Sequence, residues 1–101
     1  MVEKQQHGSG TALVRFRLPP EVTAESACVA GEFNGWSTSS HKMSRDDNGF
    51  VTVIPLETGR TYRFRYLVDG HRWENDWAAD AYLPNEFGGN DSVIDLTDGP
   101  H

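Results

Sequence analysis

The stretch Thr61–Gly70 reads TYRFRYLVDG, and its alternation of apolar and charged residues decides the fold class. Every second side chain from Tyr62 to Val68 is aromatic or aliphatic, whereas Arg63 and Arg65 stand between them. A period of two predicts a β-strand with one face in a core and the other toward solvent. The Asp-Gly pair at the end suits a tight turn, because both residue types tolerate a positive φ angle.

Similar short segments recur along the chain, separated by turn dipeptides that end in glycine: Asn-Gly, Thr-Gly, Asp-Gly and Gly-Gly. Strands are predicted over residues 11–18, 26–31, 50–56, 61–68 and 92–96. Only residues 75–82 could form a helical turn, with Asp76 as its N-cap. Several short strands without an amphipathic helix of ordinary length predict an all-β fold, an antiparallel β-sandwich.

The length of 101 residues suits one domain. Residues 1–10 are polar and contain Gly and Ser, so we expect a flexible N-terminal tail. The sandwich is expected over residues 11–97, and residues 98–101 are expected to be a frayed C-terminus.

The formal net charge of −6 is concentrated in the second half of the chain. From Asp69 onward there are eight acidic residues, and Arg72 is the single basic one. This charge argues against nucleic acid and anionic membranes as partners. Cys28 is the single cysteine, so no internal disulfide can form, and no apolar run approaches the ~20 residues of a membrane span. The first ten residues lack the apolar core of a signal peptide, and we expect a soluble, cytoplasmic protein.

Two tryptophans follow turn sequences, where a core has little use for them. Trp36 comes directly after Asn-Gly in GEFNGW, and Trp73 comes shortly after the Asp-Gly that follows the strand predicted over residues 61–68. A third stretch, residues 85–91, reads NEFGGND. A flat indole can cover the apolar face of a sugar ring, while amide, carboxylate and guanidinium groups bind its hydroxyls. The alternative, that both indoles cap the ends of the sandwich, stays open on the residues alone.

Catalysis is the first rival interpretation, because glycosidases use paired carboxylates and four acidic residues lie close in sequence. These residues are Asp69, Glu74, Asp76 and Asp80. A general acid needs an enclosed pocket, which a sandwich of this size does not offer, so we expect no enzyme activity. The four histidines have no metal-ligand spacing and are interpreted as solvated, and we expect no metal and no cofactor.

The ordered motifs GEFNGW at 31–36, GF at 49–50, YRFRYLVDG at 62–70, Trp73 and residues 85–94 resemble the family 48 carbohydrate-binding modules. That family includes the N-terminal early-set domains of isoamylase and branching enzyme, which accompany family 13 glycoside hydrolases. It also includes the glycogen-binding domain of the AMP-activated protein kinase β subunit. The resemblance covers residues 11–96 and is strongest to small bacterial proteins made of an early-set domain alone.

This resemblance implies an immunoglobulin-like, early-set β-sandwich that binds α-1,4-glucans such as glycogen, starch and maltooligosaccharides. Trp36 and Trp73 match the two stacking tryptophans of the glycogen-binding version, and Arg65 stands where that version has a lysine. Phe87 matches a leucine that reaches into the curve of the glucan. Asp91 replaces a hydrogen-bonding asparagine, for which the adjacent Asn90 could substitute.

Two departures bear on that site: Gly89 replaces a threonine, and Arg72 is an extra residue before Trp73. The resemblance also leaves a second alternative open, in which the chain is a protein-interaction or regulatory module that docks on a glucan-active enzyme or kinase. The carbohydrate-binding residues that it implies are Trp36, Arg65, Trp73, Phe87, Asn90 and Asp91.

Overall fold

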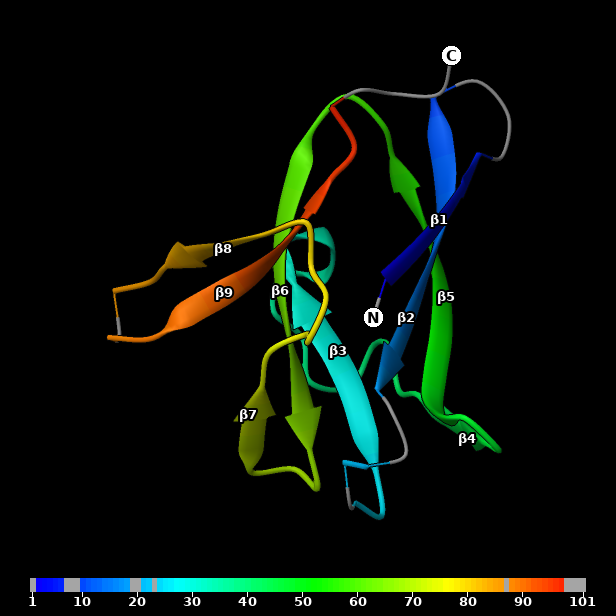
Figure 1. The fold of residues 1–101 in the computed structure, drawn as a ribbon, viewed down its shortest axis with the longest axis vertical. Coiled ribbons are helices and arrows are strands. Elements are labelled where there is room, and N and C mark those ends of the chain that lie inside the picture. Colours follow the sequence, from blue (N-terminus) through cyan, green and yellow to red (C-terminus); the bar gives the residue numbers. More distant parts are fainter. Residues whose placement is uncertain (1, 7–9, 19–20, 23, 87, 98–101) are drawn as a thin grey trace.

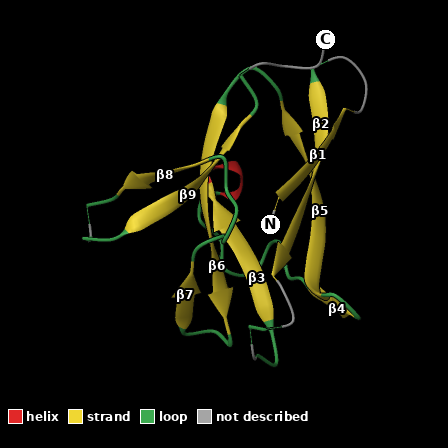
Figure 2. Cartoon of the chain, in the orientation of Figure 1, coloured by secondary structure: helices red, strands yellow, loops and turns green. Residues whose placement is uncertain are grey.

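Two antiparallel β-sheets pack as a sandwich in the computed structural model, which describes residues 2–6, 10–18, 21–22, 24–86 and 88–97 (Figure 1). The expected all-β, antiparallel sandwich is therefore confirmed. Within those ranges the helical structure is the single 3-10 turn η1, Glu32–Asn34, drawn in red in Figure 2. No helix of the described residues is long and apolar enough to cross a membrane.

The first sheet has four strands. In spatial order they are β1 (Val2–Gln6), β2 (Thr11–Leu18), β5 (Gly49–Glu57) and β4 (Ser44–Asp46). The second sheet is built around β6. Its spatial order is β3 (Ala27–Gly31), β6 (Thr61–Val68), β9 (Asn90–Asp95) and β8 (Ala81–Pro84), and β7 (Arg72–Glu74) also pairs with β6.

The core lies between the sheets and follows the alternation of the sequence. On β6 the side chains of Tyr62, Phe64 and Tyr66 are buried, as predicted, and the arginines between them are not. The Phe64 ring packs edge-on against Phe16 of β2, with the ring centroids 5.1 Å apart. Edge-to-face contacts of this kind stabilise the fold beyond the contribution from burying the rings. Cys28, in β3, is also buried.

The prediction of a flexible tail over residues 1–10 is wrong for residues 2–6. These residues form β1, which pairs antiparallel with β2 along its whole length. The pairing covers the outer edge of β2, and Val2 packs against the core. The Lys4 ammonium donates to the backbone carbonyl of Asp95 at 3.0 Å and forms an ion pair with Asp80, so β1 also reaches the second sheet. The predicted frayed end, residues 98–101, lies outside the described residues.

The prediction of a helical turn over residues 75–82 is also wrong. Residues 75–80 form a loop, and the next four residues form β8, which pairs with β9. The Asp76 carboxylate does accept the N–H of Ala78 at 2.7 Å, as an N-cap would. Its other oxygen accepts the Tyr66 hydroxyl at 2.6 Å, and its own N–H donates to the Ser92 hydroxyl at 2.8 Å. These bonds to β6 and β9 hold the segment against the sheet in place of a helix.

Asp76 and Tyr66 form a buried polar pair. The exposed fraction is 2% for Asp76 and 0% for Tyr66. Burial raises the pKa of Tyr66 well above its ordinary value, and the negative charge of Asp76 raises it further. The tyrosine therefore stays protonated and donates its hydroxyl to the carboxylate.

Replacing Tyr66 by Phe removes this donor and leaves the carboxylate buried. We expect Tyr66→Phe to lower the free energy of unfolding by about 1–3 kcal/mol, the cost of leaving a buried polar group short of a partner. Urea unfolding measures the change. Tyr82→Phe is the matched control, because the Tyr82 hydroxyl donates to the Asp76 backbone carbonyl from a more exposed position, and its effect should be smaller. Equal effects of the two substitutions would contradict the prediction.

Asp69 fixes the turn after β6 to the segment before β3. Its Oδ1 atom accepts the backbone N–H groups of Glu25 and Ser26 at 2.7 and 3.0 Å. These two hydrogen bonds lower the pKa of Asp69 below its ordinary value. A carboxyl group with a lowered pKa in the folded state stabilises the fold above its unfolded pKa, and this contribution is lost as the pH falls through the folded pKa.

We therefore expect Asp69→Asn to lower the free energy of unfolding at pH 7, and the difference from wild type to shrink below about pH 4. Asparagine tolerates the left-handed backbone of Asp69 (φ 54°), so the substitution removes the charge and keeps the turn. Urea unfolding at pH 7 and pH 3 provides the comparison. Asp47→Asn is the control, because the described residues offer Asp47 no hydrogen bond. A difference independent of pH would refute the assignment.

Candidate functional site

A groove of about 890 Å³ lies on the outer face of the second sheet, opposite the core. The residues that line it come from η1 and the turn after it, β6, β7, the end of β8, the β8–β9 connection and the start of β9: Glu32, Trp36, Arg63, Arg65, Trp73, Pro84, Asn85, Glu86 and Asp91. Three sequence segments far apart in the chain thus meet at one surface.

The GEFNGW segment forms one wall of the groove, and its shape depends on Gly31. A Cβ atom at this position would lie 2.5 Å from the Arg63 carbonyl oxygen and 2.9 Å from the Phe64 Cβ, so β3 can approach β6 here only with glycine. The chain then turns through η1. Phe33 anchors the turn by packing its ring against Phe16, with centroids 5.5 Å apart.

Trp36 is held at the end of this turn in a backbone conformation that side chains rarely adopt. Its φ angle is 61°, and its N–H donates to the Gly31 carbonyl at 2.8 Å. Its side chain keeps 38% of its surface exposed. A bulky residue in the left-handed region costs free energy, and such residues are concentrated at functional sites.

Arg65 and Trp73 lie next to each other on β6 and β7. Trp73 pairs with Leu67, so the two side chains lie on the same face of the sheet. Arg65 is two residues from Leu67 on β6, so its side chain lies on this outward face too. The Arg65 guanidinium carbon lies 5.4 Å from the centre of the indole, a cation–π contact. The Nε atom of Arg65 is buried and has no hydrogen-bond partner among the described residues. Trp73 is 41% exposed, so part of its surface is open to solvent.

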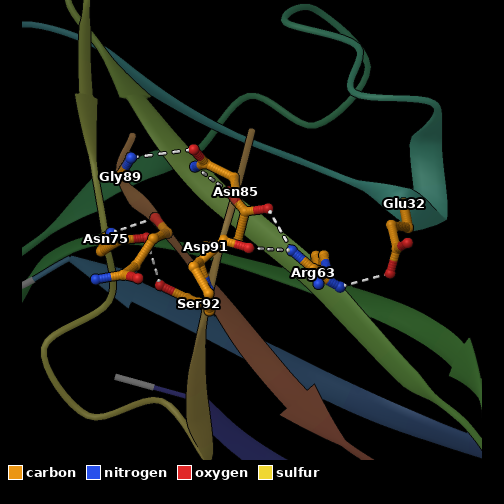
Figure 3. Close-up of polar contacts among 9 residues, drawn as sticks. Glu32, Arg63, Asn75, Asn85, Gly89, Asp91 and Ser92 are labelled. Carbon is orange, nitrogen blue, oxygen red and sulfur yellow. Dashed lines mark hydrogen bonds and ion pairs between the residues drawn. The ribbon is translucent and has the colours of Figure 1, made fainter. Parts of the chain in front are cut away.

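Arg63 connects the two ends of the groove (Figure 3). Its backbone N–H donates to the Glu32 carboxylate at 2.8 Å, where the β3–β6 ladder has ended. Its guanidinium reaches the other way and donates to the Pro84 carbonyl at 3.2 Å and to Asp91 at 3.3 Å.

The β8–β9 connection is fixed by the same network. The Asn85 amide donates to Asp91 at 3.1 Å and accepts the N–H of Gly89 at 3.1 Å (Figure 3). Asp91 is buried, and each of its carboxylate oxygens accepts a hydrogen bond from within the protein. The rim of the groove is therefore built before any ligand arrives.

The structure brings four of the six residues expected at the site to one groove: Trp36, Arg65, Trp73 and Asp91. Asn90 is not among the lining residues, and its carbonyl accepts the Asn75 amide at 2.8 Å. Phe87 lies outside the described residues. The extra residue, Arg72, forms an ion pair with Glu74, with Nε 3.1 Å from the carboxylate.

Sequence reasoning did not assign Glu32 or Arg63 to the site. Arg63 has the same parity on β6 as Arg65, and this signal could have identified it. Glu32 carried no signal of its own. The four acidic residues considered for catalysis do not line the groove, and one of them, Asp76, is the buried partner of Tyr66. Among the described residues no group of His, Cys, Asp and Glu is arranged to hold a metal ion.

This arrangement suits a neutral ligand with a flat apolar face and a polar edge. Two half-exposed indoles offer the apolar contact, and the Arg65 guanidinium lines the same groove. The positive charge of Arg63 is paired with Asp91, while Glu32 and Glu86 add negative charge to the lining. The groove as a whole is therefore no site for an anion.

The chain also resembles known proteins in sequence. The 1,4-alpha-glucan branching enzyme GlgB of Bacillus subtilis (strain 168) is 37% identical over 60 residues. That match covers 58% of this chain and 10% of the enzyme, so the similarity extends to a small part of that protein. A family model described as the glycogen recognition site of AMP-activated protein kinase matches residues 15–99. The chain therefore belongs to this carbohydrate-binding family.

Proposed function

We propose that the chain is a non-catalytic module that binds α-1,4-glucans in the groove by stacking sugar rings on Trp36 and Trp73. One observation carries the proposal: two half-exposed indoles line one groove together with the Arg65 guanidinium, which lies 5.4 Å from the centre of the Trp73 ring. A glucose ring offers a C–H face to an indole and hydroxyl oxygens to a guanidinium. Membership of a glycogen-recognition family supports the same ligand class.

The residues of the groove divide into two roles in this proposal. Trp36, Trp73 and Arg65 contact the sugar, because all three line the groove. Asp91 keeps Arg63 and Asn85 in place, since both of its oxygens are already engaged. A contact of the sugar with Phe87 or Asn90 stays a prediction from the sequence resemblance.

The affinity for a single oligosaccharide should be weak. Covering one face of an indole removes about 60–80 Å² of apolar surface, worth roughly 1.5–2 kcal/mol. A few hydrogen bonds of ~1 kcal/mol each add to this, and the cost of association opposes it. We expect dissociation constants on the order of 10 µM to millimolar. The proposed module does not catalyse a reaction on the glucan. Purified protein should therefore release no reducing sugar from glycogen.

Replacing either groove tryptophan by alanine tests the site. We expect Trp36→Ala and Trp73→Ala each to lose retention on glycogen in native affinity gels, because each removes one stacking surface. Trp77→Ala is the matched control: Trp77 is 61% exposed but does not line the groove, so this variant should be retained like wild type.

Unchanged retention of both folded groove variants would refute the proposed site. Titration with maltoheptaose separates glucan binding from protein docking. Tryptophan fluorescence should shift in wild type and in Trp77→Ala as the sugar stacks. A flat titration in wild type would favour the alternative, in which the same indoles anchor a protein partner.

A further inference from the structure

The side-chain amide of Asn34 holds the turn that carries Trp36, and it uses its full hydrogen-bonding capacity. Its oxygen accepts the N–H groups of Gly31 and Ser37 at 3.1 and 3.2 Å, one on each side of the turn. Its nitrogen donates to the Val29 carbonyl at 3.1 Å. The second proton of that nitrogen points to Nδ1 of His41, 2.9 Å away.

These bonds fix the donor and acceptor roles between Asn34 and His41. The Asn34 oxygen faces two backbone donors and its nitrogen faces a backbone acceptor, so the amide cannot be flipped without losing three hydrogen bonds. The amide nitrogen is therefore the donor toward His41, and Nδ1 must accept. An accepting Nδ1 requires a neutral imidazole with its proton on Nε2.

Within the part of the chain that the structure describes, no carboxylate forms an ion pair with His41 that would favour the protonated ring. The Phe33 ring packs edge-on against the imidazole, with centroids 6.1 Å apart, and the His41 carbonyl accepts the N–H of Val29. The charged groups on the adjoining segments are Glu32, whose carboxylate accepts the backbone N–H of Arg63, and the exposed Lys42, the next residue along the chain. Protonation would place an N–H of the ring against an N–H of the amide.

We propose that His41 is a positioning residue for Trp36: the neutral imidazole fixes Asn34 and hence the indole, and protonation of the ring loosens the turn and weakens glucan binding. The inference rests on the proposed function, because Trp36 is taken as a sugar-stacking residue.

The free protein provides the first test, without any sugar. Long-range ¹H–¹⁵N correlation spectra should show His41 at pH 7.5 with a bare Nδ1 and a protonated Nε2. The indole N–H resonance of Trp36, assigned by its loss in Trp36→Phe, should move with the same midpoint as the His41 ring between pH 7.5 and pH 5.5. A proton on Nδ1 at pH 7.5, or an indole resonance that ignores the titration of His41, would overturn the proposal.

Calorimetric titration with maltoheptaose provides the second test. The affinity of wild type should fall about three- to tenfold from pH 7.5 to pH 5.5, the effect of losing one hydrogen bond of ordinary strength. His41→Asn places an oxygen near the position of Nδ1 and does not titrate, so its affinity should stay near the wild-type value at both pH values. His41→Phe keeps a ring against Phe33 but has no acceptor, and it should bind weakly at both.

His71→Asn is the control for general histidine effects, because His71 is exposed in the β6–β7 turn, and it should keep the wild-type slope. A slope that persists in His41→Asn, or a flat profile in wild type, would overturn the role of His41 and leave glucan binding intact. Absence of maltoheptaose binding at every pH would instead refute the proposed function, and the spectra of the free protein would then decide the coupling of His41 to Trp36 alone.

Discussion

The alternation of β6 is the constraint on which both the core and the groove depend. Side chains on one face of this strand are Tyr62, Phe64 and Tyr66, which fill the space between the sheets. The residues between them, Arg63 and Arg65, therefore have to point to the outer face. A shift of register by one residue would exchange the two sets and destroy the core and the groove together. Because β3, β7 and β9 all pair with β6, the same strand also positions the segments that complete the groove.

Local pattern was sufficient for the strands that carry the core. The ranges predicted for the strands around residues 11–18 and 61–68 agree with β2 and β6, because buried strands must alternate. It did not identify β1, β4, β7 or β8, and β1 and β8 show why. The sequence of β1, VEKQQ, has almost no apolar signal, and its formation depends on an open edge of β2. Residues 75–82 combine a capping aspartate with alanines, as a helix start would, but tertiary hydrogen bonds to Tyr66 and Ser92 decide their conformation.

The groove was predictable to the extent that it depends on turns, strand parity and family resemblance. These placed Trp36, Arg65 and Trp73 on one surface. What the sequence could not show is how the polar groups are divided between ligand and scaffold. Asp91 carries the chemistry of a sugar acceptor, yet its oxygens serve Arg63 and Asn85. His41 was interpreted as solvated, yet it is half-buried and bonded to an amide seven residues away. These hydrogen bonds join residues that the fold brings together, so the order of residues along the chain does not reveal them.

All three tryptophans of the chain lie on the surface, with 38%, 41% and 61% of Trp36, Trp73 and Trp77 exposed. The core is filled instead by phenylalanine and tyrosine. No indole lies in the core, so tryptophan fluorescence reports on the surface around each ring, and for Trp36 and Trp73 on what occupies the groove. Near-ultraviolet circular dichroism of the buried tyrosines and phenylalanines reports on whether the sandwich is folded.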